Sequence, residues 1–264
     1  MTSARYSELE LSGEQFDRPH CPLRAKVIIC ATGRTGSWLL CRAMAHHGIG
    51  IPHEYFNARH VGLIATRYGI AGLADGTQLA SNAQARQAYI AALLNYRTVN
   101  GIFATKIHWG QYASYLDNDE GVALLQNAHF VHLYRRDLVA QAISFHVARE
   151  TGRWGLDDTV TTSPASAPRF FDLDQIADSM KMLADSDASW RLFFARNGIS
   201  PLSCSYEHLR SDLPSVLRTI VSTFGLNAPT SPFDYAEGGR RTLATRKCHQ
   251  GRKSGRGSWP HTSA

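Results

Sequence analysis

The sequence predicts an α/β fold, in which a single domain holds a P-loop-like, largely parallel central sheet flanked by helices. Four short apolar segments, at residues 26–31, 102–107, 130–134 and 202–206, have the composition of strands. Segments with helical apolar spacing separate them, and this alternation is typical of parallel sheets. The first strand runs into a glycine-rich turn that opens a helix, which is the arrangement of P-loop-like folds.

Length and composition support one domain and exclude several classes of protein. A chain of 264 residues is long enough for one α/β core and short for two. The five cysteines show no C-x-x-C spacing, so neither a disulfide framework nor a zinc ribbon is expected. The polar N-terminus and the absence of a run of about 18 apolar residues predict a protein that is neither secreted nor membrane-spanning. The expected location is the cytoplasm.

The charge of the chain favours an anionic partner without identifying it. The net charge is +6 and the pI is near 9.2. A basic protein of this kind can bind nucleic acid, an acidic membrane surface or an anionic nucleotide. The sequence also leaves open whether the chain touches a membrane peripherally and whether it forms a homodimer.

A long helix and a long loop are expected between the third and fourth strands. Residues 173–197 carry apolar side chains at helical spacing, which indicates a face that packs in the core. An Asp-Ser-Asp sequence at residues 185–187 predicts a break in that helix. Residues 154–171 show no apolar period and are predicted as a loop, of the length that often covers a site or contacts a substrate.

The turn after the first strand is the first candidate for an anion site. It consists of Gly33, Arg34, Thr35 and Gly36, and Ser37 opens the following helix. Such a turn points consecutive backbone N–H groups at one spot, with the positive end of the helix dipole behind them. The spacing is not that of a nucleoside-triphosphate loop, because Arg34 follows Gly33 directly and no Lys-Ser/Thr pair follows Gly36. The alternative interpretation is a tight turn without a ligand.

A second candidate follows the strand at residues 130–134. Arg135 and Arg136 end this strand, and Ser144 lies about two helical turns beyond Arg136. A guanidinium and a hydroxyl in this arrangement can converge on one phosphate group. The alternative is that the two arginines are a solvated strand end and that Ser144 has no ligand.

These two elements, in this order, resemble the sulfotransferases that use 3′-phosphoadenosine-5′-phosphosulfate (PAPS). The sequence is most similar to the bacterial trehalose and lipopolysaccharide sulfotransferase group, in which a Gly-x-Pro-x-Glu-Phe/Tyr-Phe segment follows the first helix. Residues 50–56 match that segment, and further matches lie at residues 101–109, 190–194 and 206–209. The resemblance covers roughly residues 25 to 225 and keeps the order of the motifs.

The resemblance implies a PAPS-dependent enzyme that needs no metal and releases adenosine 3′,5′-bisphosphate (PAP). Its reaction is direct in-line transfer of a sulfuryl group to an acceptor hydroxyl. The first turn would hold the 5′-phosphosulfate, with the Arg34 guanidinium and backbone N–H groups stabilising the leaving-group charge. The arginines and serine of the second element would hold the 3′-phosphate. The implied donor-site residues are Gly33, Arg34, Thr35, Gly36, Ser37, Trp38, Arg135, Arg136 and Ser144.

Two residues are candidates for the general base. Glu54 stands where the trehalose group has its catalytic carboxylate, whereas His108 matches the Lys-x-His pattern of the cytosolic sulfotransferases. A neutral imidazole suits this role at pH 7, and a glutamate needs its pKa raised by burial. Glu54 is favoured, and Lys106 is expected to face the donor or the acceptor. The alternative for Lys106 is a surface lysine.

The acceptor implied by the resemblance is a carbohydrate or a glycolipid. The trehalose enzyme carries an acid where this sequence has Ile51, so the specific sugar is left open. Tyr55, Trp109 and Trp154 are expected either to stack on the acceptor or to pack in the core. A phosphate-binding small-molecule kinase is the alternative enzyme, and a basic nucleic-acid-binding module is the alternative without catalysis.

The expected boundaries are an N-terminal extension at residues 1–24, the sulfotransferase domain at residues 25–238 and a basic tail at residues 239–264. The tail has no Asp or Glu, so a solvated charged segment is its simplest interpretation. The alternative is that it closes over the donor site, because residues 252–259 loosely resemble the segment that covers the 3′-phosphate in cytosolic sulfotransferases.

Overall fold

The computed structural model describes residues 11–74, 76–152, 154 and 172–227, all within the unit Met1–Phe233. The basic tail predicted at residues 239–264 lies outside the described residues. The predicted loop also lies outside them, apart from Trp154. Of the predicted N-terminal extension, residues 11–24 are described, and Leu11 and Phe16 are buried against the domain.

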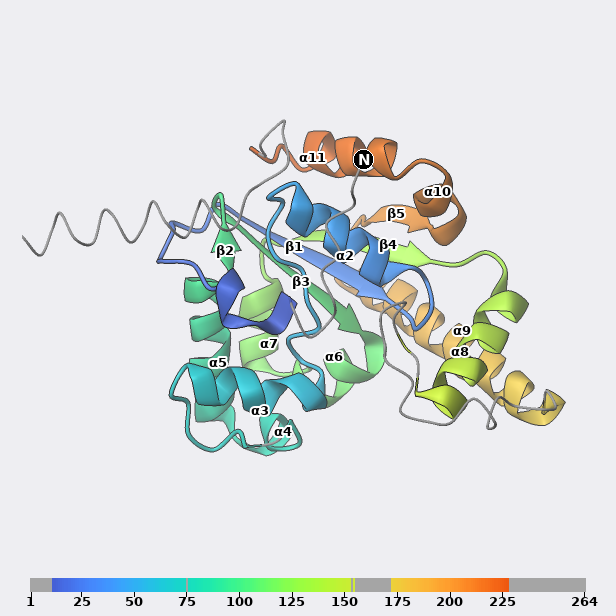
Figure 1. Ribbon diagram of the computed structural model, residues 1–264, viewed down its shortest axis with the longest axis horizontal. Helices are drawn as coiled ribbons and strands as arrows, with labels where there is room; N and C mark the ends of the chain where they lie inside the picture. Colours follow the sequence, from blue (N-terminus) through green and yellow to red (C-terminus); the bar gives the residue numbers. More distant parts are fainter. Residues whose placement is uncertain (1–10, 75, 153, 155–171, 228–264) are drawn as a thin grey trace, which may run out of the picture. The chain divides into compact units, whose positions relative to one another are not determined.

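The described residues form a five-stranded sheet in the order β2-β3-β1-β4-β5 (Figure 1). Its neighbouring strands are parallel, except that β2 and β3 form an antiparallel hairpin. The prediction of a largely parallel sheet flanked by helices is therefore confirmed. The strand β2 was not predicted, because two residues are too short to show an alternating pattern. The strands are β1 (Ala25–Ala31), β2 (Thr98–Val99), β3 (Ile102–His108), β4 (His129–Tyr134) and β5 (Leu202–Ser205).

Helices cover both faces of the sheet (Figure 1). Side chains of β1 alternate between the faces, so Val27 and Ile29 pack with α2, α10 and α11, whereas Ile28 and Cys30 pack with helices that include α3, α5 and α9. The helices are α2 (Ser37–His46), α3 (Ala58–Arg67), α4 (Gln78–Ser81), α5 (Ala83–Tyr96), α6 (Trp109–Tyr115), α7 (Asp119–Leu125), α8 (Leu138–Thr151), α9 (Leu173–Arg196), α10 (Tyr206–Ser211) and α11 (Leu213–Thr223), with a 3₁₀ turn η1 (Glu14–Phe16).

Helix α9 is continuous, so the predicted break at residues 185–187 is wrong. The Ser186 hydroxyl donates to the Met182 carbonyl at 2.8 Å, within the helix. The Asp187 carboxylate accepts from Arg191 Nε at 2.8 Å and contacts His132 Nε2 at 2.8 Å. The polar side chains therefore find partners along the helix and on β4, and they do not compete with the helical backbone.

Strand β1 lies between β3 and β4, so the chain passes from β1 to one side of the sheet and, after β3, crosses over to the other side. Ligands of α/β proteins bind at such a switch point, beyond the carboxyl ends of the strands. The register places Ala31 beside His108 on one side and beside Leu133 on the other. The turn after β1, the end of β3 and the arginines after β4 therefore share one edge of the sheet.

Candidate active site

The turn after β1 presents unpaired backbone donors at the start of α2. Arg34 has φ of 65° and Gly36 has φ of 74°, and the second of these left-handed residues is the N-cap of α2. The Thr35 hydroxyl donates to the Thr32 carbonyl at 3.0 Å and fixes the turn from inside. No described residue accepts a hydrogen bond from the backbone N–H groups of Thr35, Gly36 or Ser37. These donors suit an anion.

The two glycines of the turn allow close packing by neighbouring helices. A Cβ atom at Gly33 would lie 2.8 Å from the Phe145 ring of α8, and one at Gly36 would lie 2.7 Å from the Tyr206 ring of α10. Gln141 on α8 donates from Nε2 to the Gly33 carbonyl at 2.7 Å. The turn is therefore held between α8 and α10. The sequence analysis did not identify Gln141, although it lies one helical turn before Ser144.

Arg34 and Ser144 contact each other directly. Arg34 Nε donates to the Ser144 hydroxyl at 2.9 Å, and Arg34 Nη1 donates to the Trp154 carbonyl. Arg136, the residue expected to converge with Ser144, instead pairs with Glu207 across 3.3 Å, and its side chain is 68% exposed. The structure therefore joins Ser144 to the first turn rather than to Arg136.

Arg135 of the second predicted donor element contacts the first. Its guanidinium stands 4.5 Å from the Tyr206 ring centroid, and Nη1 donates to the Arg34 carbonyl at 3.5 Å. Its Nε atom is buried and has no hydrogen-bond partner among the described residues. A buried cationic donor without an acceptor is expensive, and an anion at this edge of the sheet would satisfy it.

Glu54 lies in a buried cluster of donors at the same edge. Its Oε1 is 2.5 Å from Lys106 Nζ and 3.1 Å from His108 Nε2. Its Oε2 accepts from Asn57 Nδ2 at 2.8 Å and from Gln111 Nε2 at 3.0 Å. The side chains of Glu54 and Lys106 are only 9% and 4% exposed, so Lys106 is not the surface lysine of the alternative interpretation.

The two candidate bases are in direct contact. The ring of His108 lies between the Ala31 carbonyl, 3.2 Å from Nδ1, and the Glu54 carboxylate, 3.1 Å from Nε2. An ionised carboxylate can only accept a hydrogen bond, so Nε2 is the donor to Glu54. Glu54 and His108 are therefore a hydrogen-bonded pair.

Asn57 and Gln111 belong to the cluster, and the sequence analysis missed both. Asn57 is the N-cap of α3 and accepts from the Arg59 backbone N–H at 3.1 Å, which leaves its amide group free to reach Glu54. Gln111 forms a capping box with His108 at the start of α6. Both residues could have been found from the sequence, because each is a helix-capping residue three positions after a candidate base.

The pKa of Glu54 is not raised as the base role requires. Burial raises this pKa, but the ammonium group of Lys106 and the ring of His108 more than reverse the effect. The pKa of Glu54 is held well below its usual range. In this arrangement Glu54 is a carboxylate with four donors around it. Lys106 Nζ also lies 5.9 Å from the Trp38 ring centroid, so it stands between Glu54 and the start of α2.

Comparison with known proteins identifies the family. Residues 26–238 match the family model described as Stf0 sulphotransferase. The chain belongs to this family. It is 27% identical over 235 residues to a trehalose 2-sulfotransferase of Mycobacterium tuberculosis, a match that covers 78% of this chain and 86% of that protein. A trehalose 2-sulfotransferase of Mycolicibacterium smegmatis is 28% identical over 151 residues, with 52% of this chain and 55% of that protein covered.

The protein is therefore a sulfotransferase, and the predicted resemblance to the trehalose sulfotransferase group is confirmed. The family decides between the alternatives that the sequence left open. The protein is an enzyme of sulfuryl transfer, so the alternatives of a small-molecule kinase and of a non-catalytic nucleic-acid-binding module are wrong.

The aromatic residues near the sulfotransferase site differ in their exposure. Tyr55 is fully buried, and its hydroxyl donates to the carbonyl of Ile51, which is buried as well. Neither side chain reaches the surface, so Tyr55 packs in the core and does not stack on the acceptor. Trp109 packs 5.2 Å from the Trp190 ring centroid and is partly exposed beside His108. Trp154 packs against Phe145.

Three further properties concern metal ligands, cysteines and membrane-spanning helices. The described residues contain no group of three or more His, Cys, Asp or Glu side chains that could hold a metal ion. Cys21, Cys30, Cys41 and Cys204, the cysteines within the described residues, form no disulfide bond there. No helix in the described part of the chain is both long enough and apolar enough to cross a membrane.

Proposed function

We propose that the protein transfers the sulfuryl group of PAPS to a hydroxyl group of a carbohydrate or glycolipid. The family supports sulfuryl transfer, and the relatives named trehalose 2-sulfotransferases support a sugar as the acceptor class. The proposal adds the donor, direct in-line transfer and the roles of individual residues. We also propose that the site works without a metal and that the sulfotransferase domain spans residues 25–238.

One observation carries the proposal: a turn with unpaired backbone N–H groups and the buried cluster around Glu54 share the carboxyl edge of β1 and β3. The turn supplies unpaired N–H groups at the start of α2. Lys106 connects the two parts, because it contacts Glu54 at 2.5 Å and the Trp38 ring at 5.9 Å. A donor bound at the turn therefore presents its transferable group towards the residues that can accept a proton.

The residues around the turn fit an anionic donor. The backbone N–H groups of Thr35, Gly36 and Ser37 and the Arg34 guanidinium would contact the 5′-phosphosulfate. The unpartnered Nε atom of Arg135 supports a second phosphate beside this turn. Ser144 would contact it together with Arg34, to which it is already bonded. Arg136 would need to leave Glu207 to take part.

Glu54 is proposed as the general base, and His108 is its hydrogen-bonded partner. The acceptor hydroxyl loses its proton to this pair while its oxygen attacks sulfur. The negative charge that develops on the leaving 5′-phosphate is stabilised by the turn N–H groups, Arg34 and Lys106. No covalent intermediate on the protein is needed. Trp109 is partly exposed beside His108, and we propose it as the aromatic residue that contacts a sugar ring.

Thermal-shift titration with PAP and with AMP tests the donor. PAP should stabilise the protein much more than AMP, because the 3′-phosphate adds contacts that only the folded site offers. Equal stabilisation by the two nucleotides would contradict the donor assignment. The transfer itself is measured with sulfur-labelled PAPS and a panel of trehalose, other sugars and glycolipids. A label that reaches none of these acceptors would contradict the acceptor class.

A further inference from the structure

We propose that Lys106 is a latch on Glu54, which holds the carboxylate inactive until an anionic donor at the turn draws the ammonium group away. The inference rests on the proposed function, because it assumes PAPS at the turn. It adds a regulation of the same site: the general base becomes able to accept a proton only in the complex with the donor. Donor binding and base activation are then one event.

The geometry of Lys106 supports the latch. The ammonium nitrogen lies 2.5 Å from Glu54 Oε1 inside the domain, where both side chains are almost completely buried. The strand holds the lysine backbone, since the Lys106 N–H donates to the His53 carbonyl at 3.0 Å. Only the flexible side chain can move. It already extends towards Trp38 in the first turn of α2, next to the free N–H groups.

The other groups that face Glu54 cannot perform this function. His108 comes from the end of β3, and its ring is fixed by the Ala31 carbonyl. Asn57 from the start of α3 and Gln111 from α6 are neutral amides. His53 precedes Glu54 in the chain and is fully buried. Lys106 is therefore the one charged group around Glu54, among the described residues, that has both the reach and the opposite sign.

The energetics give the direction of the change. A nearby cation keeps a buried carboxylate ionised, and this attraction falls as the distance grows. Phosphate oxygens at the turn compete for Lys106 with a larger negative charge than Glu54 carries. When the ammonium group moves, His108 alone still lowers the pKa of Glu54 against the effect of burial, so this pKa rises. The carboxylate can then take a proton from the acceptor hydroxyl.

Proton linkage on PAP binding tests the latch. Isothermal titration calorimetry of PAP is performed between about pH 5.5 and 7.5 in buffers of different ionisation enthalpy, which reports the protons taken up for each PAP bound. The wild-type protein should take up more protons than the Glu54→Gln variant, with the difference rising towards about one proton at the acid end. The variant is the matched control, because the phosphates of PAP titrate equally in both proteins.

The outcomes separate the latch from the proposed function. If PAP binds both proteins and the proton uptake is equal, the latch is wrong while the donor site stands. If PAP does not bind the wild-type protein, the proposed donor is wrong and the latch fails with it. Infrared difference spectra of the wild type with and without PAP give a second measurement that needs no variant. A protonated carboxylic acid band should appear with PAP at low pH, and its absence there would also overturn the latch.

Discussion

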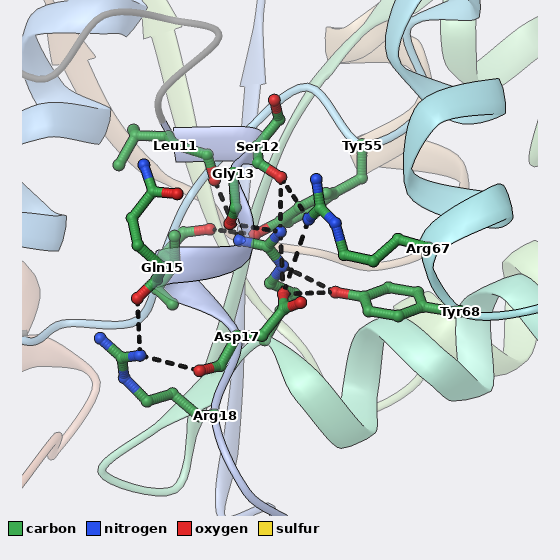
Figure 2. Close-up of polar contacts among 11 residues, drawn as sticks. Leu11, Ser12, Gly13, Gln15, Asp17, Arg18, Tyr55, Arg67 and Tyr68 are labelled. Carbon is green, nitrogen blue, oxygen red and sulfur yellow. Dashed lines mark hydrogen bonds and ion pairs between the residues drawn. The ribbon is translucent and has the colours of Figure 1, made fainter. Parts of the chain in front are cut away.

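Two buried ionic clusters lie beside the segment of residues 51–57. One surrounds the carboxylate of Glu54 and the other the guanidinium of Arg97, and the two charges have different partners. The first is the Glu54 cluster at the carboxyl edge of the sheet. The second, which we call the N-terminal clamp, joins Arg97 to Asp17, Tyr68 and the segment of residues 11–13. Figure 2 shows Asp17, Tyr68 and the segment of residues 11–13 close together. Arg97 is fully buried and donates to the carbonyl oxygens of Leu11 at 3.0 Å, Ser12 at 2.7 Å and Gly13 at 3.2 Å.

The comparison shows that burial and ion pairing alone do not mark a catalytic group. Three of the groups that accept from Arg97 are backbone carbonyls, which do not titrate. Burial lowers the pKa of Arg97, but Tyr55, Tyr68 and Asp17 more than compensate and raise it. Glu54 instead contacts two ionisable side chains, Lys106 and His108. Its cluster lies where ligands of α/β folds bind, whereas the clamp holds the N-terminal segment.

The largest effect is expected when the clamp is broken. Replacing Arg97 with Met removes its ion pair with Asp17 and its hydrogen bonds to Tyr68 and to three buried carbonyl groups. It should lower the free energy of unfolding by about 3 to 5 kcal/mol. Urea denaturation measures this loss. Arg59→Met is the control, because Arg59 is exposed, and it should change stability by less than about 0.5 kcal/mol.

The Arg97→Met variant also tests whether the clamp contributes to stability and not to catalysis. Its turnover per folded molecule should stay within a few-fold of the wild type, because the clamp does not touch the reacting groups. A variant that is stably folded yet inactive would break the distinction between the two clusters.

The second effect is expected in the Glu54 cluster. Glu54→Gln keeps the shape and hydrogen-bonding capacity of the side chain but cannot accept a proton at neutral pH. Single-turnover transfer from labelled PAPS should fall about 100-fold or more, with PAP affinity little changed. His108→Ala should cost less, through loss of the partner that orients Glu54. If Glu54→Gln transfers at nearly the native rate while His108→Ala is inactive, the base is His108.

The sequence predicted the edge of the sheet at which these groups meet, but not their contacts. Apolar periodicity predicts the strands, and the carboxyl ends of parallel strands lie at one edge of the sheet, so Arg34, His108 and Arg135 could be grouped in advance. The sequence predicted that Arg136 would converge with Ser144, but Ser144 bonds to Arg34 and Arg136 pairs with Glu207. These pairings depend on side-chain directions, which sequence spacing does not give. For the same reason the effect of Lys106 on the pKa of Glu54 was missed, although burial of Glu54 was anticipated.

A third, smaller effect separates the roles of two bonded residues in the donor site. Arg34→Ala should lower the transfer rate at saturating PAPS by roughly tenfold to 100-fold, because a charged hydrogen bond to the leaving group is worth about 1.5 to 3 kcal/mol. PAP affinity should change less than the rate. Ser144→Ala should show the reverse pattern, with weaker PAP binding and a nearly native rate at saturation. Unchanged turnover in Arg34→Ala would contradict its role.

The smallest effect concerns His53, which lies between the two clusters. Its side chain is fully buried, and neither ring nitrogen has a hydrogen-bond partner among the described residues. The ring stacks on His60 at a centroid distance of 4.7 Å. Burial lowers the pKa of His53 well below its usual range, and His60 lowers it further, although Glu54 opposes this. The folded protein therefore holds this imidazole neutral.

This arrangement predicts a loss of stability in mild acid. Below about pH 6.5 the unfolded chain binds a proton at His53 that the folded chain excludes, which costs up to about 1.4 kcal/mol per pH unit. The free energy of unfolding, measured in urea at pH 7.0 and 5.5, should fall less in His53→Leu than in the wild type. At pH 7.0 the variant should be as stable as the wild type or more stable, because it removes two unsatisfied polar atoms. An equal loss in both proteins would show that His53 is protonated in the folded state, and the segment of residues 51–57 would then carry a third charged group between the clamp and the base.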